Sequence, residues 1–162
     1  MAEYSSVYGF SAPVIVWEHE MAADNTPTAQ DLLGFEGATI LSYVGAGGIT
    51  FDASNKLEIK LLHGDDATYG NATAVAAEDV IMPSGETLGS GGIIRSFTAA
   101  KAAADTAMHA VGYVGKKRYL YVLCDFSGTH GTGTDVTASL LKDRAVSQPV
   151  GQTNYDPSTT PY

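Results

Sequence analysis

The sequence predicts an all-β fold, a β-sandwich or jelly-roll-like domain with extended N- and C-terminal arms. Three observations predict this class: short segments in which apolar and polar residues alternate, turn-forming residues between these segments, and little helical periodicity. Gly accounts for 18 of the 162 residues, as expected where many tight turns are needed. Roughly seven or eight short strands separated by such turns are typical of sandwiches and jelly rolls.

Residues 1–35 are interpreted as an N-terminal arm with an edge strand. Residues 1–9 read as a polar arm, and the next segment, Phe10–Trp17, is rich in strand-forming residues. Pro13 cannot donate a hydrogen bond to a ladder, so this segment is expected at a sheet edge or as an extended arm. The following stretch, His19–Gln30, is polar and contains a Pro that interrupts any helix.

A β-sandwich domain is predicted over residues 36–145, because strand patterns and turns follow one another throughout it. A short helical turn is expected around Ala74–Val80, and one or two helical turns are expected in the Ala-rich segment Thr98–Thr106. Residues 146–162 contain three prolines and few apolar residues, which predicts an extended C-terminal tail. The strands expected are Ala38–Val44, one beginning at Ile49–Phe51, Leu57–His63, Ile93–Phe97, Ala107–Val114, Lys117–Phe126 and Val136–Leu141.

The strand Lys117–Phe126 carries the clearest alternation. Its second face is also rather apolar, so we expect something to cover that face. Ala107–Val114 is expected to pair with it as a hairpin through Gly115-Lys116. Cys124, the single cysteine, falls on the inward face and is expected to be a buried structural thiol.

The charge of the chain argues against two classes of partner. Nine basic residues stand against eighteen acidic ones, for a net charge of −9, so direct nucleic-acid binding through phosphate contacts is not expected. No apolar run approaches the ~20 residues that span a bilayer, so no membrane association is expected. The N-terminal residues lack the pattern of a signal peptide, and we expect the chain to be made and used without Sec export.

Two patterns resemble ligand sites, and a structural explanation is favoured for each. The glycines at 45–48 follow a strand, but the next segment is extended and not a helix, so a turn is favoured over a nucleotide-binding loop. His63, Asp65 and Asp66 lie close enough in the sequence to bind a cation, yet a solvated acidic loop is favoured. No cofactor or metal is expected.

Two further groups lie between residues 119 and 130. Asp125, Ser127 and His130 include the residue types of a hydrolase triad, but nothing in their spacing shows that they converge, so a hydrogen-bonded turn is favoured and no enzyme is expected. Tyr119 and Tyr121 offer rings that could stack on a sugar, although strand tyrosines more often lie in cores or interfaces.

Two segments of the chain resemble a known class of protein. Val111–Val122, Val-Gly-Tyr-Val-Gly-Lys-Lys-Arg-Tyr-Leu-Tyr-Val, and the following Asp125–Thr134 resemble small virion proteins of tailed bacteriophages, which are often encoded beside the major capsid protein. Leu57–Asp66 looks like the same kind of strand followed by an acidic turn. The resemblance covers residues 55–145.

The resemblance implies a non-enzymatic capsid decoration (cement) protein. Such a protein is made in the bacterial host cytoplasm, binds the major capsid protein on the outer surface of the virion, commonly as a homotrimer, and stabilises the shell against the pressure of packaged DNA. Apolar residues on the arms, and two strand tyrosines, are the expected interface: Tyr4, Tyr8, Phe10, Trp17, Tyr119, Tyr121, Val150, Tyr155 and Tyr162.

Two other interpretations of the sequence stay open. The first is a neck, tail or fibre-base protein of the virion, which would be present in far fewer copies than a cement protein. The second is a carbohydrate-binding module on the virion that uses Tyr119 or Tyr121 as its stacking platform.

Overall fold

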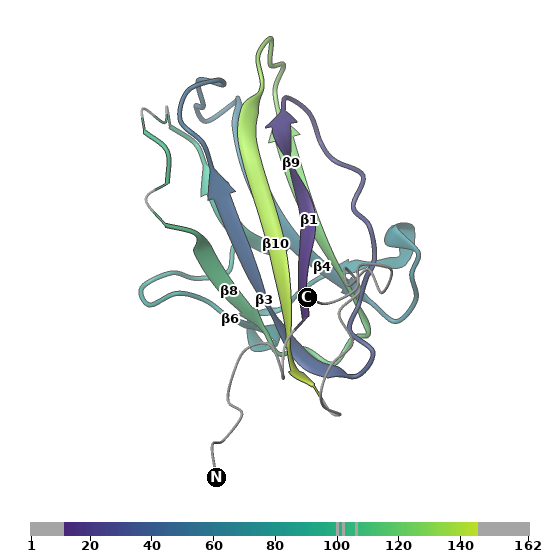
Figure 1. Ribbon diagram of the computed structural model, residues 1–162. Coiled ribbons are helices and arrows are strands. Elements are labelled where there is room, and N and C mark those ends of the chain that lie inside the picture. The colour runs from purple at the N-terminus through teal and green to yellow at the C-terminus, as the bar shows by residue number, and fades with distance from the viewer. Residues whose placement is uncertain (1–11, 100, 102, 106, 146–162) are drawn as a thin grey trace, which may run out of the picture.

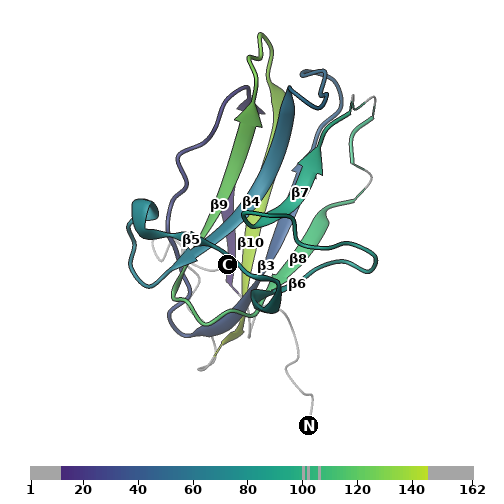
Figure 2. The ribbon, with the colours of Figure 1, turned by 180° about the vertical axis from the view of Figure 1, so that it is seen from behind.

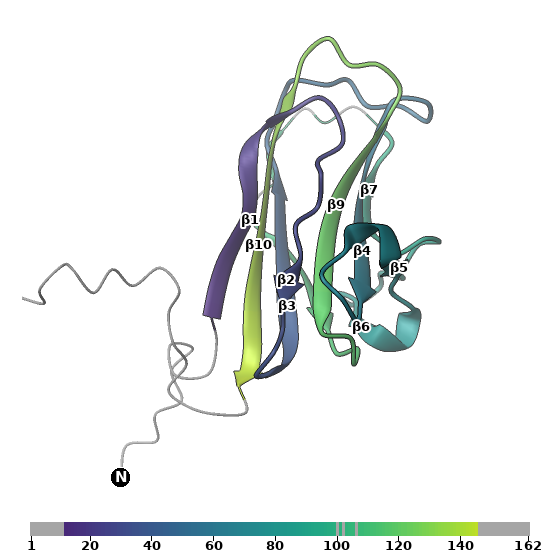
Figure 3. The same cartoon turned by 90° about the vertical axis from the view of Figure 1, so that its right-hand side faces the viewer.

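The computed structural model describes residues 12–99, 101, 103–105 and 107–145, with side chains from Glu20 onward. Two antiparallel five-stranded sheets pack face to face as a sandwich, and the side view separates the two layers (Figure 1, Figure 3). No α-helix occurs within these ranges, where two short 3₁₀ turns, η1 (Tyr69–Asn71) and η2 (Ala77–Asp79), are the helical elements. The predicted all-β sandwich is confirmed.

Each sheet combines strands that lie far apart in the sequence. Sheet A has the order β1-β10-β3-β8-β6, and sheet B has the order β2-β9-β4-β5, with β7 also paired to β4. The strands of sheet A are β1 (Ala12–Met21), β10 (Thr134–Ala145), β3 (Phe35–Val44), β8 (His109–Tyr113) and β6 (Val80–Ile81). Those of sheet B are β2 (Gln30–Asp31), β9 (Tyr119–Ser127), β4 (Lys56–Gly64), β5 (Thr73–Ala74) and β7 (Ile93–Phe97).

The strand order is that of a jelly roll. The strands β5 and β6 have two residues each and lie within the long connection between β4 and β7. The other strands, numbered along the chain from one to eight, give 1-8-3-6 for sheet A and 2-7-4-5 for sheet B. This interleaved order is produced by two Greek keys, so the jelly-roll prediction is also confirmed.

The core lies between the sheets and follows the alternation of the strands. In β4 the inward residues Leu57, Ile59 and Leu61 are fully buried, and β10 buries alternate residues from Val136 to Leu140 in the same way. Side chains on one face of a strand recur every second residue, so this burial also fixes which residues point outward. Both strands were predicted from their alternation.

Two predicted local structures are corrected. Strands β8 and β9 are not a hairpin: β8 pairs with β3 and β6 in sheet A, whereas β9 pairs with β2 and β4 in sheet B. Residues 114–118 therefore cross between the sheets. The segment Ile49–Phe51 is not a strand, although Ile49 and Phe51 are buried. The short helical turn expected around Ala74–Val80 is present as η2.

The described residues of Thr98–Thr106 form no helix, because the polar groups of this segment bind β3. Asp105 accepts hydrogen bonds from the backbone N–H of Val44 at 2.7 Å and from both terminal nitrogens of Arg95. Lys101 donates to the Val44 carbonyl at 2.7 Å and to Asp105 at 3.0 Å. A helix would also bring a Lys and an Asp four residues apart into contact. Here the Lys101–Asp105 pair instead fixes a loop to the end of β3.

The sandwich begins earlier than residue 36. The expected edge strand is present as β1, at one end of sheet A, and it pairs with β10 from Ala12 to Met21. Strand β2 then adds to the edge of sheet B through Leu120 and Tyr119. Residues 12–31 thus contribute to both sheets, and β10 runs to Ala145.

Loss of the Asp105 carboxylate is expected to destabilise the fold in a pH-dependent way. The side chain is 11% exposed; burial raises its pKa, but hydrogen bonds from Lys101, Val44 and Arg95 outweigh burial and lower the pKa below its ordinary 3.8. A lowered folded-state pKa means that the stabilisation is complete above the unfolded-state pKa and is lost as the pH falls below it. Asp105→Asn should cost about 3 kcal/mol at pH 7, measured by urea unfolding, because it leaves buried cations without their counter-charge.

The control is Asp65→Asn, which removes the same charge from a pair with Lys117 whose acid side chain is 74% exposed. It should cost less than about 1 kcal/mol. The parent protein should lose stability below about pH 4 more steeply than Asp105→Asn does. Equal costs for the two variants would contradict the structural role of Asp105.

Two neighbouring glycines before β7 offer a test of the backbone. Gly91 and Gly92 both have positive φ, 72° and 79°, but a Cβ at Gly91 meets open space whereas one at Gly92 would overlap the Leu61 carbonyl oxygen. Gly91→Ala should cost about 1 kcal/mol, for the left-handed conformation alone. Gly92→Ala should cost about 3 kcal/mol, because the backbone must also move. Urea unfolding of both variants measures the difference, and equal costs would contradict this packing of β7 on β4.

Candidate docking surfaces

On β10, β3, β8 and β6, the outer face of sheet A carries no charged side chain between Asp135 and Asp143 of β10. At the margin of this face, the register places Glu18 of β1 opposite Thr137. The register of β10 with β3 and of β3 with β8 places these residues side by side. No described segment crosses this face (Figure 1). We call it the uncharged face; its residues are Thr39, Leu41, Tyr43, Ile81, Ala110, Gly112, Thr137, Ser139 and Leu141.

The outer face of sheet B is built differently. Lys56 and Lys60 both pair with Glu58, and Lys60 also pairs with Asp125 on β9, so charges alternate across the centre of this face. Burial lowers the pKa of Lys60, but its two carboxylate partners outweigh burial and raise the pKa above its ordinary value. These charges are already satisfied among themselves.

The connection between β4 and β7 crosses the other half of sheet B (Figure 2). Tyr121 of β9 lies beneath it, fully buried, with its hydroxyl donating to the Asp66 carbonyl at 2.9 Å and its ring 5.8 Å from the ring of Tyr69. The expected cover over the second face of β9 is therefore part of the same chain. Tyr121 was expected to contact a partner or to stack on a sugar. Its ring is not accessible for either contact, because it is already enclosed by the chain itself.

The other predicted interface residues are only partly described. Tyr119 is half-buried, and the Arg118 guanidinium lies 4.9 Å from the centre of its ring. Trp17 lies in β1, opposite Ala138. The remaining predicted interface residues, Tyr4, Tyr8, Phe10, Val150, Tyr155 and Tyr162, lie outside the described residues.

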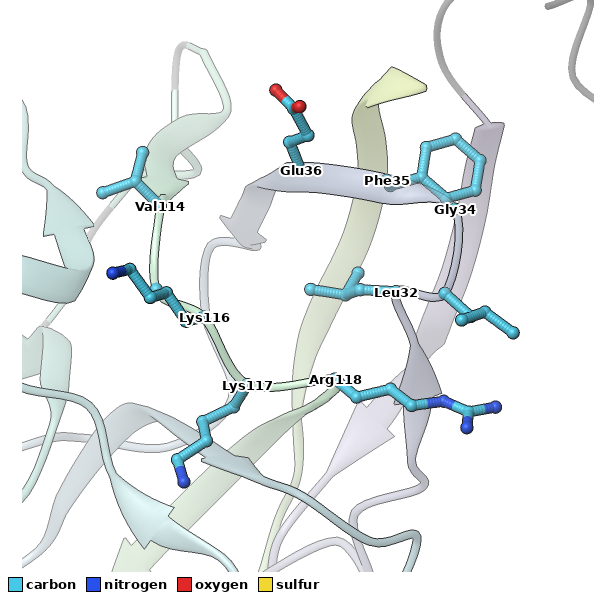
Figure 4. A pocket seen from close by; sticks show the side chains of 10 residues that line it. Leu32, Gly34, Phe35, Glu36, Val114, Lys116, Lys117 and Arg118 are labelled. Atoms are coloured by element: carbon cyan, nitrogen blue, oxygen red, sulfur yellow. The ribbon is translucent and has the colours of Figure 1, made fainter. Parts of the chain in front are cut away.

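A hollow of about 380 Å³ opens at one end of the sandwich, between residues 32–36 and residues 114–118. The Leu32 side chain points from the first segment towards the second, and three cationic side chains, Lys116, Lys117 and Arg118, extend from the second (Figure 4). Leu33 and Val114 are among the large apolar side chains that remain exposed, at 68% and 36%. We call this the end hollow; it combines apolar walls with three cations and one carboxylate, that of Glu36.

Two of the three cations of the end hollow already have partners. Arg118 donates to both carboxylate oxygens of Asp31, at 2.9 and 2.7 Å, and this hydrogen bonding lowers the pKa of Asp31. Lys117 pairs with Asp65. Lys116 is exposed and has no acidic partner among the described residues. It is the cation that a ligand in this hollow would meet.

His63, Asp65 and Asp66, for which a solvated loop was favoured over a cation site, are engaged separately. His63 is buried, and its Nδ1 lies 3.0 Å from the Tyr113 hydroxyl; burial lowers the pKa of His63 and raises that of Tyr113 to about 12. Asp66 accepts from the backbone N–H of Thr68 and from Asn71, as a turn-closing residue. Within the described part of the chain, no three His, Cys, Asp or Glu side chains gather closely enough to hold a metal ion.

Asp125, Ser127 and His130, for which a turn was favoured over a hydrolase triad, have separate partners. His130 Nε2 lies 2.9 Å from the backbone carbonyl of Ser127, and Asp125 pairs with Lys60. The turn expected there is what the structure contains.

A different Ser-His-Glu set comes together across strands. His109 Nε2 lies 2.8 Å from Glu86, and His109 faces Ser42 in the β3–β8 register. Ser42 is fully buried, and within the described ranges neither its Oγ nor His109 Nδ1 has a hydrogen-bond partner. Because a substrate cannot reach the buried Ser42 hydroxyl, this set of residues does not form a hydrolase site. These residues are far apart in the sequence, so only the strand register reveals them.

Comparison with protein-family models, with curated proteins and with solved structures found no match to this chain. In the residues that the structure describes, no helix is long and apolar enough to cross a membrane. The evidence for a function therefore comes from the surfaces of the protein.

The thiol of Cys124 should not react in the folded protein. It is fully buried on the inward face of β9, and burial raises its pKa well above the ordinary value. Because the thiolate is the reactive form, a disulfide reagent such as DTNB should label Cys124 at about pH 8 only after urea unfolding. Rapid labelling of the native protein would contradict the inward orientation.

Proposed function

We propose that this chain is a non-enzymatic bacteriophage capsid decoration (cement) protein that binds the major capsid protein on the outer surface of the virion. The observation that carries the proposal is the uncharged face of sheet A. The cores of protein interfaces are depleted in charged residues, and a broad face of this kind is typical of a docking surface. The resemblance of residues 55–145 to small virion proteins supplies the partner.

The contrast between the two outer faces supports this assignment of partner-bound and solvent-facing sides. On sheet B the charges pair with one another, and the β4–β7 connection covers Tyr121, so this side is satisfied without a partner. A net charge of −9 on a protein that coats a particle also helps to keep the particles apart.

Several identical contacts would together bind the capsid more tightly than one contact alone. A homotrimer presents three copies of the same face to a capsid lattice, and each contact after the first forms at a high effective concentration. A rigid sandwich loses little conformational entropy when it docks, which leaves more of the contact energy as affinity. The protein would then stabilise the shell against internal DNA pressure by adhesion alone.

A matched pair of substitutions tests which face binds. Ser139→Lys places a charge at the centre of the uncharged face, on β10 between Leu41 and Ile15 in the register. Ser96→Lys makes the same change at an exposed position of β7 in sheet B. Ser139→Lys should lower occupancy on capsids by at least about tenfold, for a buried uncompensated charge, and Ser96→Lys should leave it unchanged.

Occupancy is measured by quantifying the bound protein after sedimentation with expanded capsids, with thermal unfolding to confirm that both variants are folded. Full occupancy for Ser139→Lys would exclude this face. The number of copies per virion separates the cement role from a neck, tail or fibre-base role, because only a cement protein should approach the abundance of the major capsid protein.

A further inference from the structure

The described chain ends beside the end hollow. Ala145, the last residue of β10, pairs with Phe35, and Phe35 lines the hollow. The segment 146–162 is therefore attached to the chain at a residue that pairs with the wall of the hollow. The β3–β4 connection, by contrast, follows Val44 and lies at the opposite end of the same strand, β3.

The chemistry of residues 146–162 complements that of the hollow. Asp156 is the one charged side chain in this stretch, and Tyr155 lies directly before it. An aromatic ring next to a carboxylate matches exposed apolar walls next to the exposed cation Lys116. Burial of the ring against Leu33 and Val114 removes apolar surface from water.

The reach of the chain permits the contact. Tyr155 is ten residues beyond Ala145, and an extended chain spans at most ~3.3–3.6 Å per residue, so it can go out and return. Because the segment and the hollow belong to one molecule, their effective concentration is in the millimolar range or above, which favours docking even when the contact is weak.

We propose that the C-terminal segment 146–162 folds back into the end hollow of its own chain, with the Tyr155 ring between Leu33 and Val114 and the Asp156 carboxylate at Lys116. This proposal is independent of the capsid role, since it concerns the isolated protein. The other candidate occupants are the same segment of a second copy and residues 1–11, which carry one acid, Glu3, and precede Ala12 near the same end.

The experiment uses the full chain with a spin label at Ser158→Cys, since Cys124 is buried and should not take the label. The label should broaden the methyl NMR signals of Leu33 and Val114 and spare those of Ile49 in the connection at the opposite end. Lys116→Glu should reduce the broadening, and Lys116→Glu combined with Asp156→Lys should restore it, because the charge pair is then reversed.

Three outcomes would overturn the proposal. One is the absence of broadening at Leu33 and Val114. Another is broadening that persists undiminished, apart from dilution, when spin-labelled copies are mixed with isotope-labelled copies that carry no spin label, which assigns the hollow to a second molecule. The last is broadening from a label at Ser6→Cys but not from Ser158→Cys, which assigns it to the N-terminal segment.

Discussion

Burial of alternate residues between the two sheets is the constraint on which the rest of this structure depends. Leu57, Ile59 and Leu61 on β4 face the inward residues of β3 and β10, and the interleaved strand order means that neither half of the chain forms this core alone. Once the inward set is fixed, the period of two fixes the outward set. The outward residues contribute little to this core, so the fold does not require the absence of charge between Asp135 and Asp143 on β10, β3, β8 and β6, and the proposed docking site rests on this absence.

The connection between β4 and β7 determines which face is open. It adds β5 to sheet B and β6 to sheet A, and on the way it covers Tyr121. One half of the outer face of sheet B is therefore covered by the chain itself. On the other half, the charged side chains already pair with one another. Sheet A has neither kind of protection on the strands described, so the two sides of one sandwich differ in what they can bind.

The alternation of residues predicted most strands, but it could not predict how they pair. The same sequence pattern, a strand followed by a Gly-Lys turn and a second strand, occurs in hairpins and in connections that cross from one sheet to the other. The prediction that β8 pairs with β9 was therefore wrong. Phe51 is buried but lies in a loop. A short apolar segment that packs into the core without regular backbone hydrogen bonds has the same sequence pattern as a strand. The end hollow and the pairing of Ser42 with His109 join residues far apart in the chain, and only the register brings them together. The cover over the second face of β9 was expected, whereas its source within the chain was not.

The two proposals make competing demands on the same residues. Tyr155 was predicted as an interface residue, yet in the end hollow its ring would already be buried against its own domain. A segment that leaves one site for another contributes only the difference between the two binding free energies. If both proposals hold, the tail strengthens capsid binding only where the capsid offers it a better site than Leu33, Val114 and Lys116 do. The uncharged face, which has no such competitor among the described residues, would then supply most of the affinity.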